Sequence, residues 1–336
     1  MDTVCATVGI DVSKQKLDIA LLVDGKIKTK VVENSAPGHQ ALLEWLGKSK
    51  LPLSALHVCL EATGVYSEPV ALVLHQAGML VSLVNPACIK GFGQSENIRN
   101  KNDIVDAKLI ARYCAAMKPQ LWTPPPLEQR QLRAWSQRIH TLKDIRQQEE
   151  NRLEALTISG MNDVAEHVKQ SIAWLNAAIE KLESDINDHI DRHPGLKHDA
   201  ELLSSIPGVG MTTVAKILGQ LGDIRRFASA KAFAAFIGVT PRQRSSGSSL
   251  RSRTVISRTG NTALRAALYM PSMVARRHNP ILRQFAERLA NNGMAKKAVI
   301  AAVMHKLVHL IYGVIHNDKP FDPNYQIKGL AIQDGI

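Results

Sequence analysis

Cysteine is scarce in this chain, and the few cysteines show no pattern. The chain has four, Cys5, Cys59, Cys88 and Cys114, and their spacing suggests no pairing. Cys59 lies in an apolar, strand-like run where it can serve as a small hydrophobic side chain. The sequence therefore gives no sign of a disulfide framework, and it favours a reduced, cytoplasmic setting.

Long apolar runs are also missing. No basic segment follows Met1, as a secretory signal would require, and the most apolar late stretch, residues 298–315, is interrupted by His305, Lys306 and His309. We therefore expect neither a signal peptide nor a membrane span. With 336 residues, of which 45% are hydrophobic, the chain is long enough for two or three domains with cores of their own.

Acidic residues are absent between Asp223 and Glu287, an interval that holds twelve Lys and Arg residues. Residues 196–336 as a whole carry 20 Lys and Arg against seven Asp and Glu. Solvated surfaces usually mix both signs, so this run predicts a polyanionic partner such as nucleic acid. A basic face that is merely solvated is the alternative.

The first third of the chain alternates strand-like and helix-like segments. This alternation predicts one α/β domain with a mixed sheet, which the run Pro124-Pro125-Pro126 ends. We expect strands at 7–10, 17–23, 28–33, 56–61 and 80–84, and helices near 39–46, 68–77 and 104–117.

Two apolar seams follow, on either side of Ser159-Gly160. Their spacing of three and four residues is typical of coiled coils and predicts two long helices. These helices could pack on each other, on another subunit, or inside a single domain. The seams are Leu132, Trp135, Ile139 and Leu142, then Ile172, Leu175, Ile179, Leu182 and Ile186.

The last third is expected to be mainly helical, with a glycine-containing turn at residues 207–210. Gly208 and Gly210 in such a turn can bring backbone amides against a phosphate, as in a helix-hairpin-helix turn that binds DNA. A tight helix connection without a ligand is the alternative. No Gly-Lys-Ser/Thr follows, so the turn is not a P-loop. His305 and His309 lack a third ligand nearby in the sequence, which favours ordinary packing or surface roles.

Four acidic residues occur where strands end or a helix begins. Asp11 follows an apolar strand beside a hairpin turn, Glu61 ends the strand at 56–61, and Asp103 and Asp106 share one face of a helix start. Hard divalent cations bind several oxygens, and a pair of them can assist both oxygens of a phosphodiester displacement. The four acids therefore predict a nuclease-like metal site. The alternative is structural, with Asp103 as a helix N-cap, Asp106 near the helix dipole and Asp11 as a turn residue.

A loop rich in serine and glycine spans residues 240–251. Its serines could bind a phosphate or attack it, and its arginines could clamp a phosphodiester. A flexible linker is the alternative, and the spacing does not say which serine matters.

Several motifs together resemble the DEDD transposases of bacterial insertion sequences. They occur in order over nearly the whole chain: Val8-Gly9-Ile10-Asp11, Glu61-Ala62-Thr63-Gly64, Asp103-Ile104-Val105-Asp106, Ile206-Pro207-Gly208-Val209-Gly210 and Ser246-Gly247-Ser248-Ser249. The resemblance implies an α/β plus all-α protein. Its parts would be an RNase H/RuvC-like DEDD domain at 1–123, a coiled-coil connector at 127–195, and a transposase domain at 196–325 with the helix-hairpin-helix-like turn and a serine loop.

The same resemblance implies an RNA-guided DNA recombinase. Asp11, Glu61, Asp103 and Asp106 would bind Mg²⁺, and Ser246 would attack the scissile phosphate. The partners would be donor and target DNA, a structured bridge RNA encoded by the element, and further subunits in a dimer to tetramer with shared active sites. The protein would work in the bacterial cytoplasm, at the nucleoid. Nucleic acid would lie against Gly208, Gly210, Arg242, Arg244, Arg251, Arg253, Arg258 and Arg265.

Two other functions remain open. One is a metal-dependent junction resolvase in which water replaces the serine, although such a hydrolase would not require the Ser-Gly-Ser-Ser loop. The other is a nucleic-acid-binding protein without catalytic activity. It would have no use for four convergent acids, which repel DNA unless a metal neutralises them.

Overall fold

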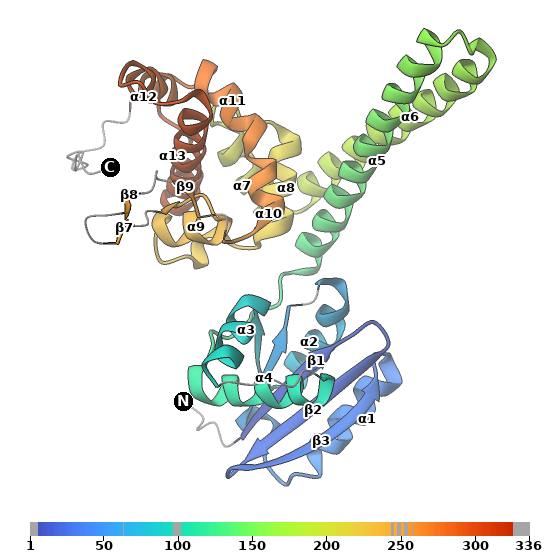
Figure 1. The fold of residues 1–336 in the computed structure, drawn as a ribbon, viewed down its shortest axis with the longest axis vertical. Helices are drawn as coiled ribbons and strands as arrows, with labels where there is room; N and C mark the ends of the chain where they lie inside the picture. Colours follow the sequence, from blue (N-terminus) through green and yellow to red (C-terminus); the bar gives the residue numbers. More distant parts are fainter. Residues whose placement is uncertain are drawn as a thin grey trace. The chain divides into compact units, whose positions relative to one another are not determined.

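The structure is a computed structural model that describes residues 6–62, 64–96, 102–242, 245–246, 250–251, 255–257 and 259–324. The chain forms two compact units, Met1–Pro124 and Pro125–Ile336 (Figure 1). The boundary between them falls in the proline run, where neither a helix nor a central strand can continue. The further division of the second unit into a connector and a transposase domain stays a prediction.

The first unit is built on a five-stranded mixed sheet. Its order is β3-β2-β1-β4-β5, with antiparallel pairs β1–β2 and β2–β3 and parallel pairs β1–β4 and β4–β5. The α/β fold with a mixed sheet is therefore confirmed. The strands are β1 (Ala6–Val12), β2 (Lys16–Val23), β3 (Lys26–Glu33), β4 (Leu56–Glu61) and β5 (Leu80–Val84).

Four α-helices belong to this unit. They are α1 (Ala36–Gly47), α2 (Ser67–Gln76), α3 (Pro86–Ser95) and α4 (Asp103–Met117), with short 3-10 turns at Leu53–Ala55 and Gly64–Tyr66. Three of the four were expected from the sequence. The fourth, α3, was not, although Pro86 stands at its first position and the side chain of Asn85 caps it.

The two faces of the sheet are covered differently. Val8 and Ile10 of β1 are fully buried in a core that includes Leu42 of α1 and Leu74 of α2. The alternate residues of β1 face α4 instead. Thr7 Oγ1 donates a hydrogen bond to the carbonyl oxygen of Ala111 in α4 at 3.0 Å. One face of the sheet thus packs into an apolar core with α1 and α2. The other face, which α4 covers, carries Asp11.

Gly9 allows α4 to lie unusually close to the sheet. A Cβ atom at Gly9 would come within 2.2 Å of both the carbonyl oxygen of Ala107 and the amide nitrogen of Ala111. Ala20 of β2, which pairs with Gly9 of β1, packs with the same two alanines. Small residues on both sides of this contact set the distance between helix and sheet.

The second unit begins with a pair of long helices. α5 (Leu127–Ile158) and α6 (Asn162–Arg192) are joined by a short turn and pack on each other (Figure 1). Seam residues such as Leu142, Leu175 and Ile179 are buried together between them. Packing of the two helices on each other is therefore confirmed for these residues, whereas Leu132, Ile139 and Ile186 of the same seams are buried in the core of the second unit with the later helices.

The rest of the second unit is mainly helical, as expected. α13 is its central helix, with Val303, Leu307 and Ile311 buried and with α7, α9, α11 and α12 packed around it. By length and composition α13 is also apolar enough to cross a membrane, and its place in the core explains that composition. The helices are α7 (Pro194–Ser204), α8 (Met211–Leu221), α9 (Ala230–Ile237), α10 (Thr262–Ala267), α11 (Tyr269–His278), α12 (Pro280–Asn291) and α13 (Lys296–Asn317), with a 3-10 turn at Ile224–Arg226.

Candidate active site

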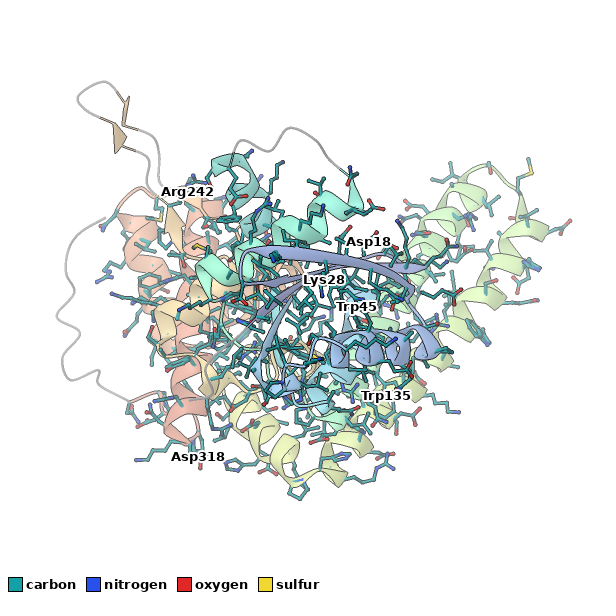
Figure 2. The ribbon with its side chains drawn as sticks, turned by 90° about the horizontal axis from the view of Figure 1, so that it is seen from below. Asp18, Lys28, Trp45, Trp135, Arg242 and Asp318 are labelled. Atoms are coloured by element: carbon teal, nitrogen blue, oxygen red, sulfur yellow. The ribbon has the colours of Figure 1, made fainter. Side chains whose placement is uncertain are left out.

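Three acidic residues form a row across neighbouring strands. The register pairs Asp11 of β1 with Asp18 of β2, and it pairs Ile10 with Leu60, so that Glu61 of β4 lies beside Asp11. Because laterally paired residues project to the same side of a sheet, all three carboxylates lie on the face covered by α4. Figure 2 labels Asp18 at this sheet. The position of Asp11 on a strand beside a hairpin is confirmed.

The first turn of α4 brings two more carboxylates, those of Asp103 and Asp106. The N-cap is Asn102, whose Oδ1 accepts a hydrogen bond from the amide of Val105 at 2.8 Å. The alternative in which Asp103 caps the helix is therefore wrong. Capping by Asn102 leaves both aspartates inside the helix, where their side chains project from its first turn.

The charges of these acids act on one another. The pKa of Asp11 is raised to about 6, mainly because the carboxyl is partly buried and then because of the negative charges of Asp106, Glu61, Asp103 and Asp18. The structure thus gathers the other three predicted acids around Asp11, with Asp18 as a fifth member of the cluster. Carboxylates that repel one another in this way favour a bound cation.

The donor set fits a divalent cation by its oxygens and its charge. Among the residues that the structure describes, however, no three His, Cys, Asp or Glu side chains stand close enough to hold one metal ion. The positive charge found among the acids is that of Lys16, whose Nζ lies 2.8 Å from Asp103 Oδ2 and 3.1 Å from Asp18 Oδ2. Two of the acids, Asp18 and Asp103, therefore share one ammonium group in this structure.

A hydrogen-bond network fixes the strand ends that carry these acids. Asn34 Nδ2 donates to the carbonyl oxygen of Ser13 at 2.9 Å and to that of Tyr66 at 3.1 Å. Its Oδ1 lies 2.9 Å from Nε2 of His39, a buried side chain. The network joins the β1–β2 turn to the segment that follows Glu61. Neither Asn34 nor Asp18 was predicted from the sequence, although a carboxylate inside the apolar run of β2 was a visible signal.

The predicted serine loop lies in the second unit, as two short ribbons. β6 (Pro241–Arg242) pairs with β9 (Val255–Ile256), and β7 (Ser245–Ser246) pairs with β8 (Leu250–Arg251), with Ser246 opposite Leu250. The side chain of Arg242 is exposed (Figure 2). Of Ser246 and Arg251 the structure describes the backbone, while Arg244, Arg253 and Arg258 lie outside the described residues.

Arg265 holds the base of this loop. It donates hydrogen bonds to the carbonyl oxygen of Ile237 and to Thr262 Oγ1, both at 3.2 Å. A Cβ atom at Gly260 would lie 2.5 Å from the carbonyl oxygen of Phe236 and 2.6 Å from the amide nitrogen of Gly238. The backbone segments that enter and leave the loop therefore pack directly on each other. Contact of Arg265 with nucleic acid stays a prediction.

The glycine turn joins α7 and α8 as expected. Gly208 has a φ of +103°, and a Cβ atom there would meet the backbone of Ala275 in α11 at 2.7 Å. Packing alone thus accounts for glycine at this position. Gly210 is exposed at the N-cap of α8 with open space around it. Phosphate binding at the turn stays a prediction.

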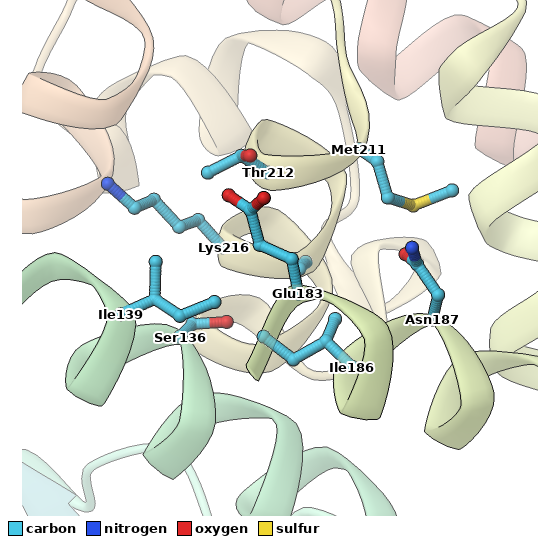
Figure 3. Close-up of a pocket in the computed structure, with 9 residues that line it drawn as sticks. Ser136, Ile139, Glu183, Ile186, Asn187, Met211, Thr212 and Lys216 are labelled. Atoms are coloured by element: carbon cyan, nitrogen blue, oxygen red, sulfur yellow. The ribbon is translucent and has the colours of Figure 1, made fainter. Parts of the chain in front are cut away.

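A cavity of about 110 Å³ lies between α5, α6 and α8 (Figure 3). Ser136 lines it with a buried hydroxyl that has no hydrogen-bond partner among the described residues, and Glu183 lines it while pairing with Lys143 at 2.7 Å. None of the catalytic, metal-binding or nucleic-acid-binding residues predicted from the sequence lines this cavity, so it is separate from the candidate site.

Two of the histidines of α13, His305 and His309, pack together. The ring centroids of His305 and His309 are 4.5 Å apart, and burial lowers the pKa of His309 to about 4. This arrangement agrees with the packing role expected for them.

Comparison with known proteins identifies the family. A family profile described as "Transposase IS116/IS110/IS902 family" matches residues 200–287, and a second profile, for DEDD transposases, matches residues 8–158. The pilin gene-inverting protein of Moraxella bovis is 34% identical over 317 residues, which cover 94% of this chain and 97% of that protein. The chain belongs to the IS116/IS110/IS902 family of transposases.

A second transposase agrees with this assignment. The transposase for insertion sequence element IS1328 of Yersinia enterocolitica is 26% identical over 204 residues, or 52% of this transposase and 58% of that one. RuvC of T. thermophilus, solved in complex with a Holliday junction substrate, matches 33% of this chain and 95% of its own, with 17% identity and a TM-score of 0.26.

Membership of the family establishes the general chemistry. This transposase is an enzyme that binds DNA and cleaves and rejoins its strands. A DEDD nuclease domain uses divalent metal ions, in agreement with the acids gathered around Asp11.

Proposed function

We propose that this transposase exchanges DNA strands through a covalent phosphoserine at Ser246, assisted by Mg²⁺ at Asp11, Glu61, Asp103 and Asp106. The observation that carries the proposal is the gathering of the other three acids around Asp11, on one face of the sheet. Such a cluster suits an ion that neutralises a phosphate in transfer.

The proposed reaction conserves the number of phosphodiester bonds. The Ser246 hydroxyl oxygen bonds to the scissile phosphorus and loses its proton to water, while the bond from phosphorus to the 3′ oxygen breaks and that oxygen takes up a proton. A 3′ hydroxyl from another strand then attacks the phosphoserine, displaces the serine oxygen and restores a DNA linkage. The covalent intermediate makes rejoining possible without an external energy source. When bound, Mg²⁺ neutralises charge on the phosphate and the departing oxygen.

The residues around Ser246 suit the handling of a phosphate. Arg242 is exposed on the short ribbon at the base of the serine loop, and the loop carries further arginines at 244, 251 and 253. Guanidinium groups bind phosphate oxygens in pairs and stabilise charge that develops during transfer. We infer that Arg242, Arg244, Arg251, Arg253, Arg258 and Arg265, with Gly208 and Gly210, form the surface that meets nucleic acid.

We further infer that a structured RNA from the element guides the choice of DNA. The basic surplus of residues 196–336 suits binding to the backbones of both RNA and DNA. If base pairing supplies the sequence specificity, the protein needs to read mainly shape and phosphate positions. The working form would be a dimer to tetramer at the bacterial nucleoid, where its DNA substrates are.

Inversion is one outcome that this chemistry allows. The relative in Moraxella bovis is named a pilin gene-inverting protein. Strand exchange between two sites on one DNA molecule inverts the segment between them when the sites face each other, and the same chemistry between two molecules inserts DNA. We therefore propose that a single reaction serves both insertion and inversion.

The test is to incubate the protein with Mg²⁺, the noncoding RNA of the element, and labelled donor and target DNA. Denaturing gels run with and without protease should show a protein–DNA adduct that Ser246→Ala abolishes and Ser245→Ala retains. Joined product should require the RNA. In Asp11→Asn, cleavage should fall more than about 100-fold, because a ligand of the metal is lost.

Other results would point to other functions. Nicking that requires Mg²⁺ but proceeds at the parental rate in Ser246→Ala, with no adduct, would replace the phosphoserine with water and indicate a resolvase. DNA binding without any cleavage would indicate a nucleic-acid-binding protein without catalytic activity. Joining that proceeds equally well without RNA would remove the guide from the proposal.

A further inference from the structure

Lys16 stands between two carboxylates of the acid cluster, of which Asp103 is a proposed metal ligand and Asp18 is not. Its Nζ lies 2.8 Å from Asp103 Oδ2 in the first turn of α4 and 3.1 Å from Asp18 Oδ2 on β2. Lys16 and Asp18 are two residues apart on one strand, so both side chains lie on the α4 face of the sheet. A single ammonium group therefore joins the sheet to the start of the helix.

The two ends of this link differ in burial. The side chain of Asp18 is 4% exposed, whereas that of Asp103 is 56% exposed. A buried carboxylate needs a partner to compensate for its lost hydration, while an exposed one exchanges partners at little cost. Asp18 is thus the permanent partner of Lys16, and Asp103 is the exchangeable one.

The backbone of Lys16 is fixed in place. Ser13 N donates a hydrogen bond to the carbonyl oxygen of Lys16 at 3.0 Å, and Ser13 Oγ donates to the same oxygen at 2.9 Å. The amide of Lys16 donates to Ser13 Oγ at 3.1 Å. A closed turn of this kind fixes the backbone position from which the lysine side chain reaches the two carboxylates.

We propose that Lys16 is an internal counter-ion of the acid cluster: it holds Asp103 against the sheet before a divalent cation binds and releases it when the cation arrives. The inference rests on the proposed metal site. Asp18 keeps the ammonium group nearby in both states, so it serves to position Lys16 and is not an additional metal ligand. The start of α4 is thereby held close to the sheet before the cation binds. The cation must then compete with the lysine for Asp103.

This competition predicts that removing Lys16 raises the affinity for Mg²⁺, whereas removing a metal ligand lowers it. In Lys16→Gln, Mg²⁺ measured by calorimetry should bind about fivefold more tightly than in the parent, the scale of one partly exposed ion pair. In the same variant without cation, the amides of residues 103–106 should exchange hydrogen faster, and added Mg²⁺ should restore their protection. Lys16→Arg keeps a cation between the two carboxylates and should leave both measurements close to the parental values.

Lys14 provides the matched control. It is exposed in the same turn, and no ion pair joins it to an acid among the residues that the structure describes. Lys14→Gln removes the same charge from the same neighbourhood and should change the Mg²⁺ affinity less than about twofold. If Lys16→Gln binds Mg²⁺ no more tightly than Lys14→Gln, or more weakly than the parent, the counter-ion role is overturned.

The Asp11→Asn variant distinguishes a failure of the counter-ion role from a failure of the proposed metal site. If the parent binds Mg²⁺ and Asp11→Asn does not, the metal site stands, and the comparison of Lys16 with Lys14 decides the role of Lys16 alone. If the parent and Asp11→Asn give the same weak binding, the metal site and the counter-ion role both fail.

Discussion

Gly9 determines how the acids meet, although it has no side chain of its own. A Cβ atom at Gly9 would lie 2.2 Å from the carbonyl oxygen of Ala107, so the backbone of α4 occupies the space that a side chain there would need. In that helix Asp103 lies one turn before Ala107 and Asp106 lies immediately before it, while Asp11 is two residues further along β1 than Gly9. The distance between helix and sheet at Gly9 therefore sets the distance between the two groups of carboxylates.

Gly9→Ala should damage both the fold and the site. The added methyl group collides with backbone atoms, which cannot rotate away, so α4 must move off the sheet. We expect the free energy of unfolding of the first unit to fall by about 3 kcal/mol, with loss of DNA cleavage in the protein that remains folded. Chemical denaturation followed by circular dichroism measures the first effect, and the nicking assay measures the second.

Gly47 is the matched control for this substitution. It ends α1 in the same unit, and a Cβ atom there would meet nothing within 4 Å. Gly47→Ala should leave cleavage unchanged and leave stability unchanged or raised by up to about 1 kcal/mol. If Gly9→Ala were as stable and as active as Gly47→Ala, the close approach of α4 would not be needed.

Among the helices, α13 carries a titratable group inside a packed core. His309 is half-buried, its Nε2 has no hydrogen-bond partner among the described residues, and its pKa is lowered to about 4 from the usual 6.5. Burial is the main cause, and the neighbouring charges of His305, Lys306 and Lys231 add to it. The helix is therefore best packed when His309 is neutral.

This packing makes the stability of the second unit depend on pH. Between about pH 6.5 and pH 4 the unfolded chain binds a proton at His309 that the folded chain does not, so stability is complete above this window and falls as the pH falls through it. The denaturation midpoint of the parent should drop between pH 7.5 and about pH 5. His309→Phe should lessen that drop, because the ring stays and the titration is lost.

His140 offers a control for this measurement. It is exposed on α5, away from any core. His140→Gln should show the same drop in midpoint as the parent. An equal drop in the His309→Phe variant would assign the acid sensitivity to other groups.

The elements that the sequence predicted correctly are those with a regular apolar pattern. The seams of α5 and α6 repeat their apolar residues at the spacing of a helix, and the strands are short runs rich in apolar and β-branched residues. The helix α3 was missed because it is short and contains Gly91 and Gly93, which lower helix propensity. The cap of α4 was assigned to the wrong residue because Asn102 and Asp103 are both good caps by type, and the backbone geometry selects Asn102.

Across the whole molecule, the sequence predicted the kinds of residue in the site better than their arrangement. Asp11, Glu61, Asp103 and Asp106 were recognisable by residue type and by their places at strand ends and a helix start. Asp18 and Lys16 could not be placed, because their meeting with the other acids depends on the register of β1 with β2 and on the approach of α4. Both are non-local contacts that no spacing along the chain reports.

The proposed active site also depends on how the two units are arranged among the proposed subunits. The acids belong to the first unit and Ser246 to the second, with α5 and α6 between them in the chain. An oligomer can therefore build each active site from one subunit or from two. The proposed sharing of sites predicts that two inactive variants, Asp11→Asn and Ser246→Ala, restore each other when they are combined.

The experiment is to co-express the two variants with different tags and purify the mixed oligomer. In a two-subunit assembly with shared sites, the acids of the Ser246→Ala subunit meet the serine of the Asp11→Asn subunit. One of the two sites is then intact, and about half of the parental cleavage should return. If each subunit builds its own site, both sites are broken and no cleavage should appear. Asp11→Asn mixed with Ser245→Ala controls for assembly, because it should give about half of the parental cleavage under either arrangement.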